Sequence, residues 1–82
     1  MTENEIIASL AEIVGEVVEV DNIELSRETT ADDIEGWDSV AHVNILVAVE
    51  SKFGVRFDAA EISSLSSVGV LADLVSAKLM AR

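Results

Sequence analysis

The spacing of apolar residues near the start of the chain predicts an amphipathic helix. Apolar side chains recur every three or four residues, which places them on one face of a helix. Thr2 and Glu5 have the spacing of a capping box, in which each side chain accepts a hydrogen bond from the backbone amide of the other residue. We therefore expect a helix from this box to about Val18. Its inward face is formed by Ile6, Leu10, Ile13, Val14 and Val17.

The apolar periodicity stops between Glu19 and Trp37, where acidic and small polar residues dominate. We expect one long loop over these residues. Loops of this length are uncommon in compact domains and often carry function. Three apolar residues are expected to hold the loop against the core, namely Ile23, Leu25 and Ile34.

A second long helix is predicted from Ser39 to Phe53. Asp38 precedes it as an N-cap, and Gly54 follows it where a left-handed residue often ends a helix. Its inward stripe consists of Ile45, Leu46, Val49 and Phe53, and a second apolar stripe consists of Val40, Val43 and Val47. A helix that is apolar on two sides is either deeply buried or exposes an apolar patch for a partner. The valines are therefore either core residues or docking residues.

The last third of the chain predicts a short helix and then a longer one. Asp58 and Glu61 form another cap pair, and Ser63 and Ser64 end the first helix after one or two turns. Ser67 caps the final helix, whose apolar stripe is Val68, Leu71, Leu74, Val75 and Leu79. The expected fold is an all-α four-helix bundle in one domain over residues 1–82, with three longer helices, a short third helix and a long first loop.

Charge narrows the choice of partners. The chain has 82 residues, with 16 acidic and 5 basic side chains and a net charge of −11. Twelve of the acids lie in residues 1–38, where Arg27 is the only base. Nucleic acids and anionic membranes would repel this chain, so we expect neither as a partner. Basic proteins are the natural partners of a chain that we expect to be monomeric.

Several function classes are disfavoured by length and composition. A domain of this size buries too little surface to enclose a deep active site, which favours a binding or carrying role over an enzyme. The absence of cysteine removes disulfides, thiolate catalysis and thiolate metal sites. No apolar run approaches the roughly 20 residues that span a bilayer. The N-terminus is acidic where a secretory signal is basic, so a cytoplasmic location is expected.

Ser39 is the candidate site residue because of its position. A hydroxyl in the first turn of a helix, just after a long loop, is accessible to a modifying enzyme. A phosphodiester at this position would meet free backbone amides and the positive end of the helix dipole. The alternative is an ordinary polar residue at a helix start.

The surroundings of Ser39 resemble the acyl carrier protein family. Gly36-Trp37-Asp38-Ser39-Val40, followed by a helix that ends in Val49-Glu50-Ser51-Lys52-Phe53-Gly54-Val55, is similar to the Asp-Ser-Leu region and second helix of that family. Leu65-Ser66-Ser67-Val68 is similar to the segment before its last helix, so the resemblance covers essentially the whole chain.

The resemblance implies a function and a cofactor. The hydroxyl of Ser39 would receive 4′-phosphopantetheine from coenzyme A through a separate phosphopantetheinyl transferase. Asp38 resembles the family's aspartate near the metal of that complex. The arm would carry an acyl or aminoacyl group as a thioester and present it to acyl-loading and acyl-transferring enzymes, while the carrier itself catalyses nothing.

The chain departs from fatty-acid carriers in its second helix. Those carriers have several acids there, whereas this helix has only Glu50, and Val40 replaces the usual leucine. The Gly36-Trp37 pair looks more like the stand-alone carriers of specialised pathways, and the Gly-Gly-His-Ser pattern of peptidyl carriers is absent. A specialised biosynthetic pathway is therefore expected.

The predicted docking surface follows from these departures. Its apolar centre is expected at Val40, Val43 and Val47 with Asn44 beside them, and its acidic rim lies in the preceding loop. The rim residues are Asp32, Asp33, Glu35 and Asp38. Partners with basic and apolar docking surfaces would fit.

Trp37 is interpreted as an anchor for the loop, with contact to the prosthetic arm as the alternative, and it is kept among the cofactor-binding candidates.

His42 lies three residues after Ser39, which raises the possibility of a serine hydrolase. No carboxylate is placed to orient the histidine, and no oxyanion loop is evident.

The acidic loop does not fit the calcium-binding EF-hand motif either. Placing Gly36 at the sixth position of that motif puts Ala31 first and His42 twelfth, so the ligands at both ends are missing. The remaining alternative is a small helical interaction module that carries no modification.

Overall fold

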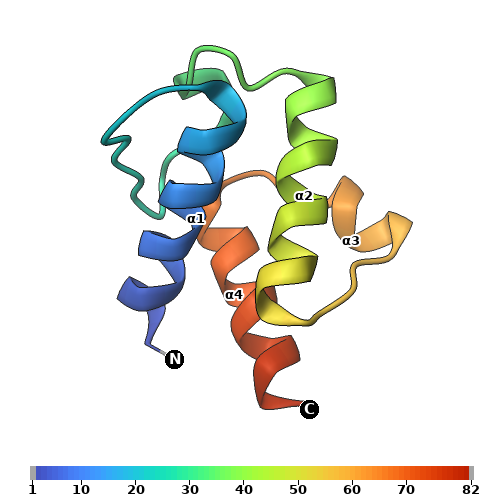
Figure 1. Cartoon of the computed structure of the whole chain (residues 1–82). Helices are drawn as coiled ribbons and strands as arrows, with labels where there is room; N and C mark the ends of the chain where they lie inside the picture. Colours follow the sequence, from blue (N-terminus) through green and yellow to red (C-terminus); the bar gives the residue numbers. More distant parts are fainter. Residues whose placement is uncertain (1, 82) are drawn as a thin grey trace.

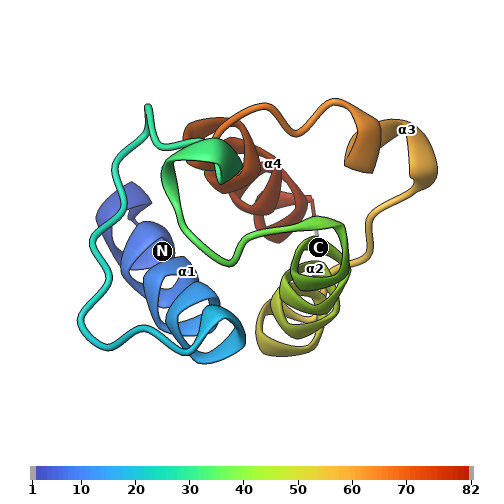
Figure 2. The same cartoon turned by 90° about the horizontal axis from the view of Figure 1, so that it is seen from above.

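The computed structural model describes residues 2–81 and confirms an all-α fold of four helices, one of them short. The helices are α1 (Glu3–Val18), α2 (Ser39–Phe53), α3 (Ala59–Ser63) and α4 (Val68–Met80). α1 packs against both α2 and α4. Figures 1 and 2 show α3 beside α2, on the side of the bundle away from α1. The described residues contain no strand.

The predicted helix caps are present. The backbone amide of Glu5 donates to the Thr2 hydroxyl at 3.2 Å, and the Thr2 amide donates to the Glu5 carboxylate at 2.9 Å. Asp58 and Glu61 form the same reciprocal pair at the start of α3. Gly54 ends α2 in the left-handed conformation, with φ of 67°. The caps fix where the helices begin and end, and so set the lengths of the connections between them.

One hydrophobic core joins the three long helices. Its fully enclosed side chains are aliphatic, Phe53 is the one aromatic residue of the buried cluster, and Trp37 and Phe57 are partly buried against it. The inward stripes expected of α1 and α2 are buried, except that Val17 is half-buried. Leu74 and Leu79 of α4 are also half-buried. The largest fully buried side chains are Ile6, Leu10, Val14, Ile45, Val49, Val68 and Val75.

The connection between α1 and α2 is more ordered than the predicted irregular loop. It contains a short 3-10 helix, η1 (Ala31–Asp33). The Asp33 carboxylate accepts hydrogen bonds from the Thr30 amide at 2.9 Å and the Thr30 hydroxyl at 3.3 Å. Ile23, Leu25 and Ile34 pack against the core as expected. The expectation of one loop from Glu19 to Trp37 was therefore wrong at η1, where this local pair stabilises a turn of helix.

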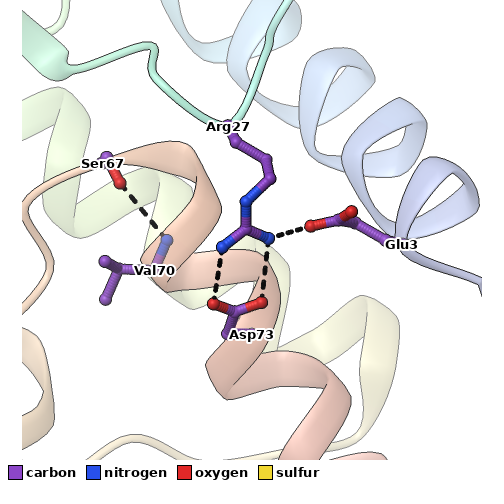
Figure 3. A network of polar contacts seen from close by, with 5 residues as sticks. All are labelled: Glu3, Arg27, Ser67, Val70 and Asp73. Carbon is purple, nitrogen blue, oxygen red and sulfur yellow. Dashed lines mark hydrogen bonds and ion pairs between the residues drawn. The ribbon is translucent and has the colours of Figure 1, made fainter.

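The middle of this connection is fixed to the rest of the fold. Arg27 forms a two-pronged ion pair with Asp73 of α4, with nitrogen–oxygen distances of 3.0 and 2.8 Å, and it also pairs with Glu3 of α1 (Figure 3). The Arg27 guanidinium lowers the pKa of Asp73. The amide of Gly69 donates to the Arg27 carbonyl at 3.0 Å, and the amide of Val68 donates to the Thr29 carbonyl at 2.8 Å. The start of α4 and the loop therefore hold each other.

The contact between Gly69 and Arg27 leaves no room for a side chain. A Cβ at position 69 would lie 2.9 Å from the Arg27 carbonyl oxygen and 3.1 Å from the Arg27 Cβ. We predict that Gly69→Ala lowers the free energy of unfolding by roughly 1–3 kcal/mol, because the loop must move away from α4. Urea unfolding measures this. In open space the same change within a helix would stabilise the protein by about 1 kcal/mol, so a variant as stable as the wild type would contradict the tight contact.

Candidate functional site

Ser39 is the first residue of α2 and is exposed. Asp38 caps the helix, because its Oδ1 accepts a hydrogen bond from the Ala41 amide at 2.8 Å. Within residues 2–81 the Ser39 hydroxyl makes no hydrogen bond, and neither do the amides of Ser39 and Val40. The site therefore combines an accessible hydroxyl with free amides at the positive end of a helix dipole. That chemistry fits a covalently attached phosphodiester.

Trp37 anchors the loop where it enters α2. Its ring is half-buried and packs against the core, as the anchor interpretation requires. The indole Nε1 donates to Nδ1 of His42 at 3.1 Å, and the two rings are stacked with centroids 6.2 Å apart. Trp37 and His42 thus brace the end of the loop against the first turns of α2. Whether Trp37 also contacts the arm stays a prediction.

The pairing with Trp37 accounts for His42. One ring nitrogen accepts the indole proton, and no hydrogen bond joins His42 to a carboxylate within residues 2–81. A hydrolytic triad needs a group that orients the histidine toward the serine.

In the described part of the chain, no group of three or more histidine or acidic side chains lies close enough together to hold a metal ion.

A small pocket of about 150 Å³ lies next to the Trp37–His42 pair. It is bounded by η1, the start of α2, the α3–α4 connection and the first turn of α4. Hydroxyl, carboxylate and imidazole groups share its wall with apolar side chains. Its lining residues are Thr30, Ala31, Asp32, Trp37, His42, Leu65, Ser66, Ser67, Val68 and Leu71.

The second apolar stripe of α2 faces solvent. Val40 is 71% exposed, and Val43 and Val47 are each 59% exposed, so the alternative that they are core residues is wrong. Asn44 is exposed beside them. An apolar stripe therefore begins next to Ser39 and continues along α2.

The acids around this stripe differ in their contacts. The carboxylate of Glu50, the only acid of α2, accepts a hydrogen bond from the Phe57 amide at 2.8 Å and so closes the loop after the helix. Asp33 caps η1, as described above. Asp32 and Glu35 are exposed and make no hydrogen bond or ion pair within residues 2–81. They are the rim acids whose carboxylates are fully available to a partner.

α3 is held beside α2 by polar contacts with α4. Glu61 pairs with Lys78 at 2.9 Å, and the Lys78 ammonium lies 5.7 Å from the centre of the Phe57 ring. Hydrogen bonding from the Asp58 amide, and then from Lys78, lowers the pKa of Glu61. The acids with shifted pKa values thus belong to helix caps and ion pairs, at a distance in sequence from Ser39.

Comparison with known proteins agrees with this geometry. The family model described as the phosphopantetheine attachment site matches residues 8–75. An acyl carrier protein of Acidothermus cellulolyticus is 34% identical over 93% of this chain and 90% of its own length. One of Myxococcus xanthus is 35% identical over 90% of this chain and 94% of its own length. A meromycolate extension acyl carrier protein of Mycolicibacterium smegmatis is 38% identical over 83% of this chain and 69% of its own length.

A solved structure is similar over nearly the whole fold. The solution structure of a holo acyl carrier protein from Geobacter metallireducens has a TM-score of 0.85 and 41% sequence identity, and the match covers 92% of this chain and 86% of that chain. The chain described here belongs to the acyl carrier protein family, whose members carry acyl groups on phosphopantetheine and are not catalysts. Among its described residues, no helix is both long and apolar enough to cross a membrane.

The Trp37–His42 hydrogen bond is open to a direct test. We predict that His42→Ala lowers the free energy of unfolding by about 1 kcal/mol, because a half-buried indole N–H loses its acceptor. The fluorescence of Trp37, the only tryptophan, should change at the same time. Asn44→Ala, an exposed change on the same helix, is the control and should alter neither quantity. Equal effects of the two substitutions would contradict the bracing role of His42.

Proposed function

We propose that Ser39 is the attachment residue for 4′-phosphopantetheine and that the whole chain, residues 1–82, acts as one carrier domain. The observation that carries this proposal is the exposed, unpaired Ser39 hydroxyl at the capped start of α2. The family match spans the same position. The free amides of the first turn favour the negative charge that the phosphodiester brings.

In the attachment step, the oxygen of Ser39 attacks the β-phosphate of coenzyme A on a separate phosphopantetheinyl transferase. The serine proton passes to that enzyme or to water, and a bond forms between the serine oxygen and the β-phosphorus. The bond from this phosphorus to the oxygen that bridges the two phosphates breaks, and adenosine 3′,5′-bisphosphate leaves with that oxygen. Only Oδ1 of Asp38 accepts the hydrogen bond of the helix cap. The other carboxylate oxygen would therefore be free to bind the metal of that complex. When attached, the arm supplies a terminal thiol that holds the cargo as a thioester.

The cargo proposed here is an acyl or aminoacyl group of a specialised biosynthetic pathway. Support comes from α2, where the single acid, Glu50, is bonded to its own chain. One relative also bears a specialised name, the meromycolate extension acyl carrier protein. We also propose that the carrier is cytoplasmic and monomeric. The net charge of −11 supports the monomer, because identical copies repel each other.

Partner enzymes are proposed to bind the stripe of Val40, Val43 and Val47, with Asn44 beside it and Asp32 and Glu35 at the rim. The stripe is exposed and adjoins Ser39, so a protein that covers it also receives the arm. Asp33 and Asp38 add negative charge to this rim while their side chains cap helices. Rim charges mainly speed association with a basic surface, and buried apolar contacts slow dissociation.

The attachment residue is tested with coenzyme A and a broad-specificity phosphopantetheinyl transferase. Mass spectrometry should show one added arm on the wild-type chain, and peptide mapping should place it on Ser39. Ser39→Ala should abolish the added mass, whereas Ser51→Ala, a change at an exposed serine of the same helix, should not. A wild-type chain that is never modified would favour the unmodified interaction module instead.

The docking surface is tested by placing a charge on the stripe. We predict that Val43→Asp or Val47→Asp slows acyl transfer to the enzyme that the carrier serves by about tenfold or more, because a buried charge opposes the apolar contact. Thermal melts should remain near the wild-type value, since both side chains are exposed. Ser51→Asp adds the same charge at the far end of α2 and serves as the control. Normal transfer by both valine variants would exclude the stripe as the docking centre.

A further inference from the structure

An open groove lies on the side of the fold that carries α1 and the loop after it. Its volume is about 1030 Å³, far larger than the pocket beside Trp37. One wall is a single face of α1, and the other wall is the chain from Val20 to Arg27. In Figures 1 and 2 this part of the loop runs along the outer side of α1, across the bundle from α3. The α1 residues that line the groove are Glu3, Asn4, Ile7, Ala8, Ala11, Glu12, Gly15 and Glu16.

The loop forms an arch that is fixed at both ends. At one end the Val20 amide donates to the Gly15 carbonyl at 2.9 Å, and at the other end Arg27 pairs with Glu3 and Asp73. Within the described chain, no hydrogen bond or ion pair joins residues 21–25 to α1. The groove is therefore bordered by a loop that is fixed at both ends and that packs against the core through Ile23 and Leu25.

The groove is lined in part by small and apolar side chains. Ala8 and Ala11 present small side chains, which allow another backbone to approach α1 closely. Ile7, Ile23 and Leu25 are partly buried, and each leaves some apolar surface in the groove. Exposed apolar surface of this kind, bordered by polar residues, is typical of a protein interaction site.

The borders of the groove are acidic on both sides. Glu12 and Glu16 lie one turn apart on α1, and Asp21 and Glu24 lie on the loop. All four are exposed, and none makes an ion pair within residues 2–81. The single base of the groove, Arg27, is already neutralised by Glu3 and Asp73. The groove thus presents an apolar line between two rows of negative charge.

We infer that this groove is a second docking site, and that its occupant is a basic amphipathic helix of a partner protein. An apolar ridge on that helix would contact Ile7, Ala8 and Ala11, while lysine or arginine side chains on its two flanks would meet the acidic borders. An extended strand fits less well, because this all-α surface offers no sheet edge for it to extend. The opposite charge of the two surfaces would also speed their encounter.

Occupation of this groove leaves the arm free. No residue of α2 lines it, so a helix seated in the groove does not cover Val40, Val43 or Val47. A partner held at the groove would keep the carrier nearby while the arm enters an active site at the α2 face. Such a tether raises the effective concentration of the thioester without slowing its release from that active site. The inference rests on the proposed function in one respect. The protein bound in the groove is taken to be an enzyme that receives cargo from the phosphopantetheine arm.

The groove is tested with a synthetic helical peptide that has leucine along one face and lysines on both flanks of that face. In an NMR titration of the labelled protein, shifts should concentrate on the amides of Ile7, Ala8, Ala11, Ile23 and Leu25. The affinity should fall as salt is added, because exposed charges are screened. Ser39→Ala protein should bind the peptide as tightly as wild type, which separates this site from attachment of the arm.

Two matched variants decide where the peptide binds. Glu12→Lys combined with Glu16→Lys should weaken binding by about tenfold or more. Asp32→Lys combined with Glu35→Lys changes the net charge equally at the other acidic region and should have less than about a twofold effect. Ala8→Trp, at an exposed position, should block the groove without changing the charge. Equal weakening by both charge variants, shifts centred on α2, or no binding at low salt would each overturn the proposal.

Discussion

The position of Ser39 depends on how the chain between α1 and α2 is held. This connection leaves the end of α1, reaches the start of α4, and returns across the top of the bundle to α2 (Figure 2). Its midpoint is fixed by the backbone bonds to Val68 and Gly69 and by the fork of Arg27 on Asp73. Exposed ion pairs contribute little stability on their own. The tight backbone contact at Gly69 is therefore the main support of the loop. The ion pair between Arg27 and Asp73 fixes where the loop lies along α4.

With the loop fixed in this way, the domain has two exposed surfaces of different chemistry. They are the valine stripe of α2 and the acidic groove beside α1. On one side, α2 is free to expose valines, because other side chains of this helix, mainly those of its inward stripe, make its contacts with the core. On the other side, the groove beside α1 gathers Glu12, Glu16, Asp21 and Glu24, none of which forms an ion pair within residues 2–81. The valines and the acidic side chains of these two surfaces lie outside the core, whereas Ile7, Ile23 and Leu25 of the groove pack against it. A small domain that carries cargo can therefore vary both surfaces to suit its partners while the fold stays the same.

Much of this fold was predictable from sequence because its signals are local. The capping pairs at Thr2 and Asp58, and Gly54 after α2, act over a few residues and mark helix ends directly. The exposure of Val43 was expected from its place beside Ser39, but periodicity alone left the core alternative open, because periodicity places a residue on a face without saying what covers that face. The same limit applies to Arg27, whose partners lie 24 and 46 residues away. Such contacts depend on how the helices pack.

The chemistry of the site was predictable from the sequence. The contacts that hold the residues around the site in place were less predictable. Ser39 was singled out by its position after Asp38, a short-range pattern. The bond from Trp37 to His42 had no comparable signal, since a spacing of five residues across a helix start is not a standard side-chain pair. The Thr30–Asp33 pair did have one, because it repeats the cap spacing seen elsewhere in the chain. η1 was predictable from that spacing, although the long acidic stretch around it suggested irregular structure.

The uncovered valines of α2 also bear on the colloidal behaviour of the chain. An apolar stripe on a small soluble surface invites self-association, which mutual repulsion between copies of charge −11 opposes. The two features are therefore coupled: the acids keep the stripe available by keeping identical chains apart. Acidification that neutralises the carboxylates would remove this repulsion and leave the apolar stripe open to contact between identical chains.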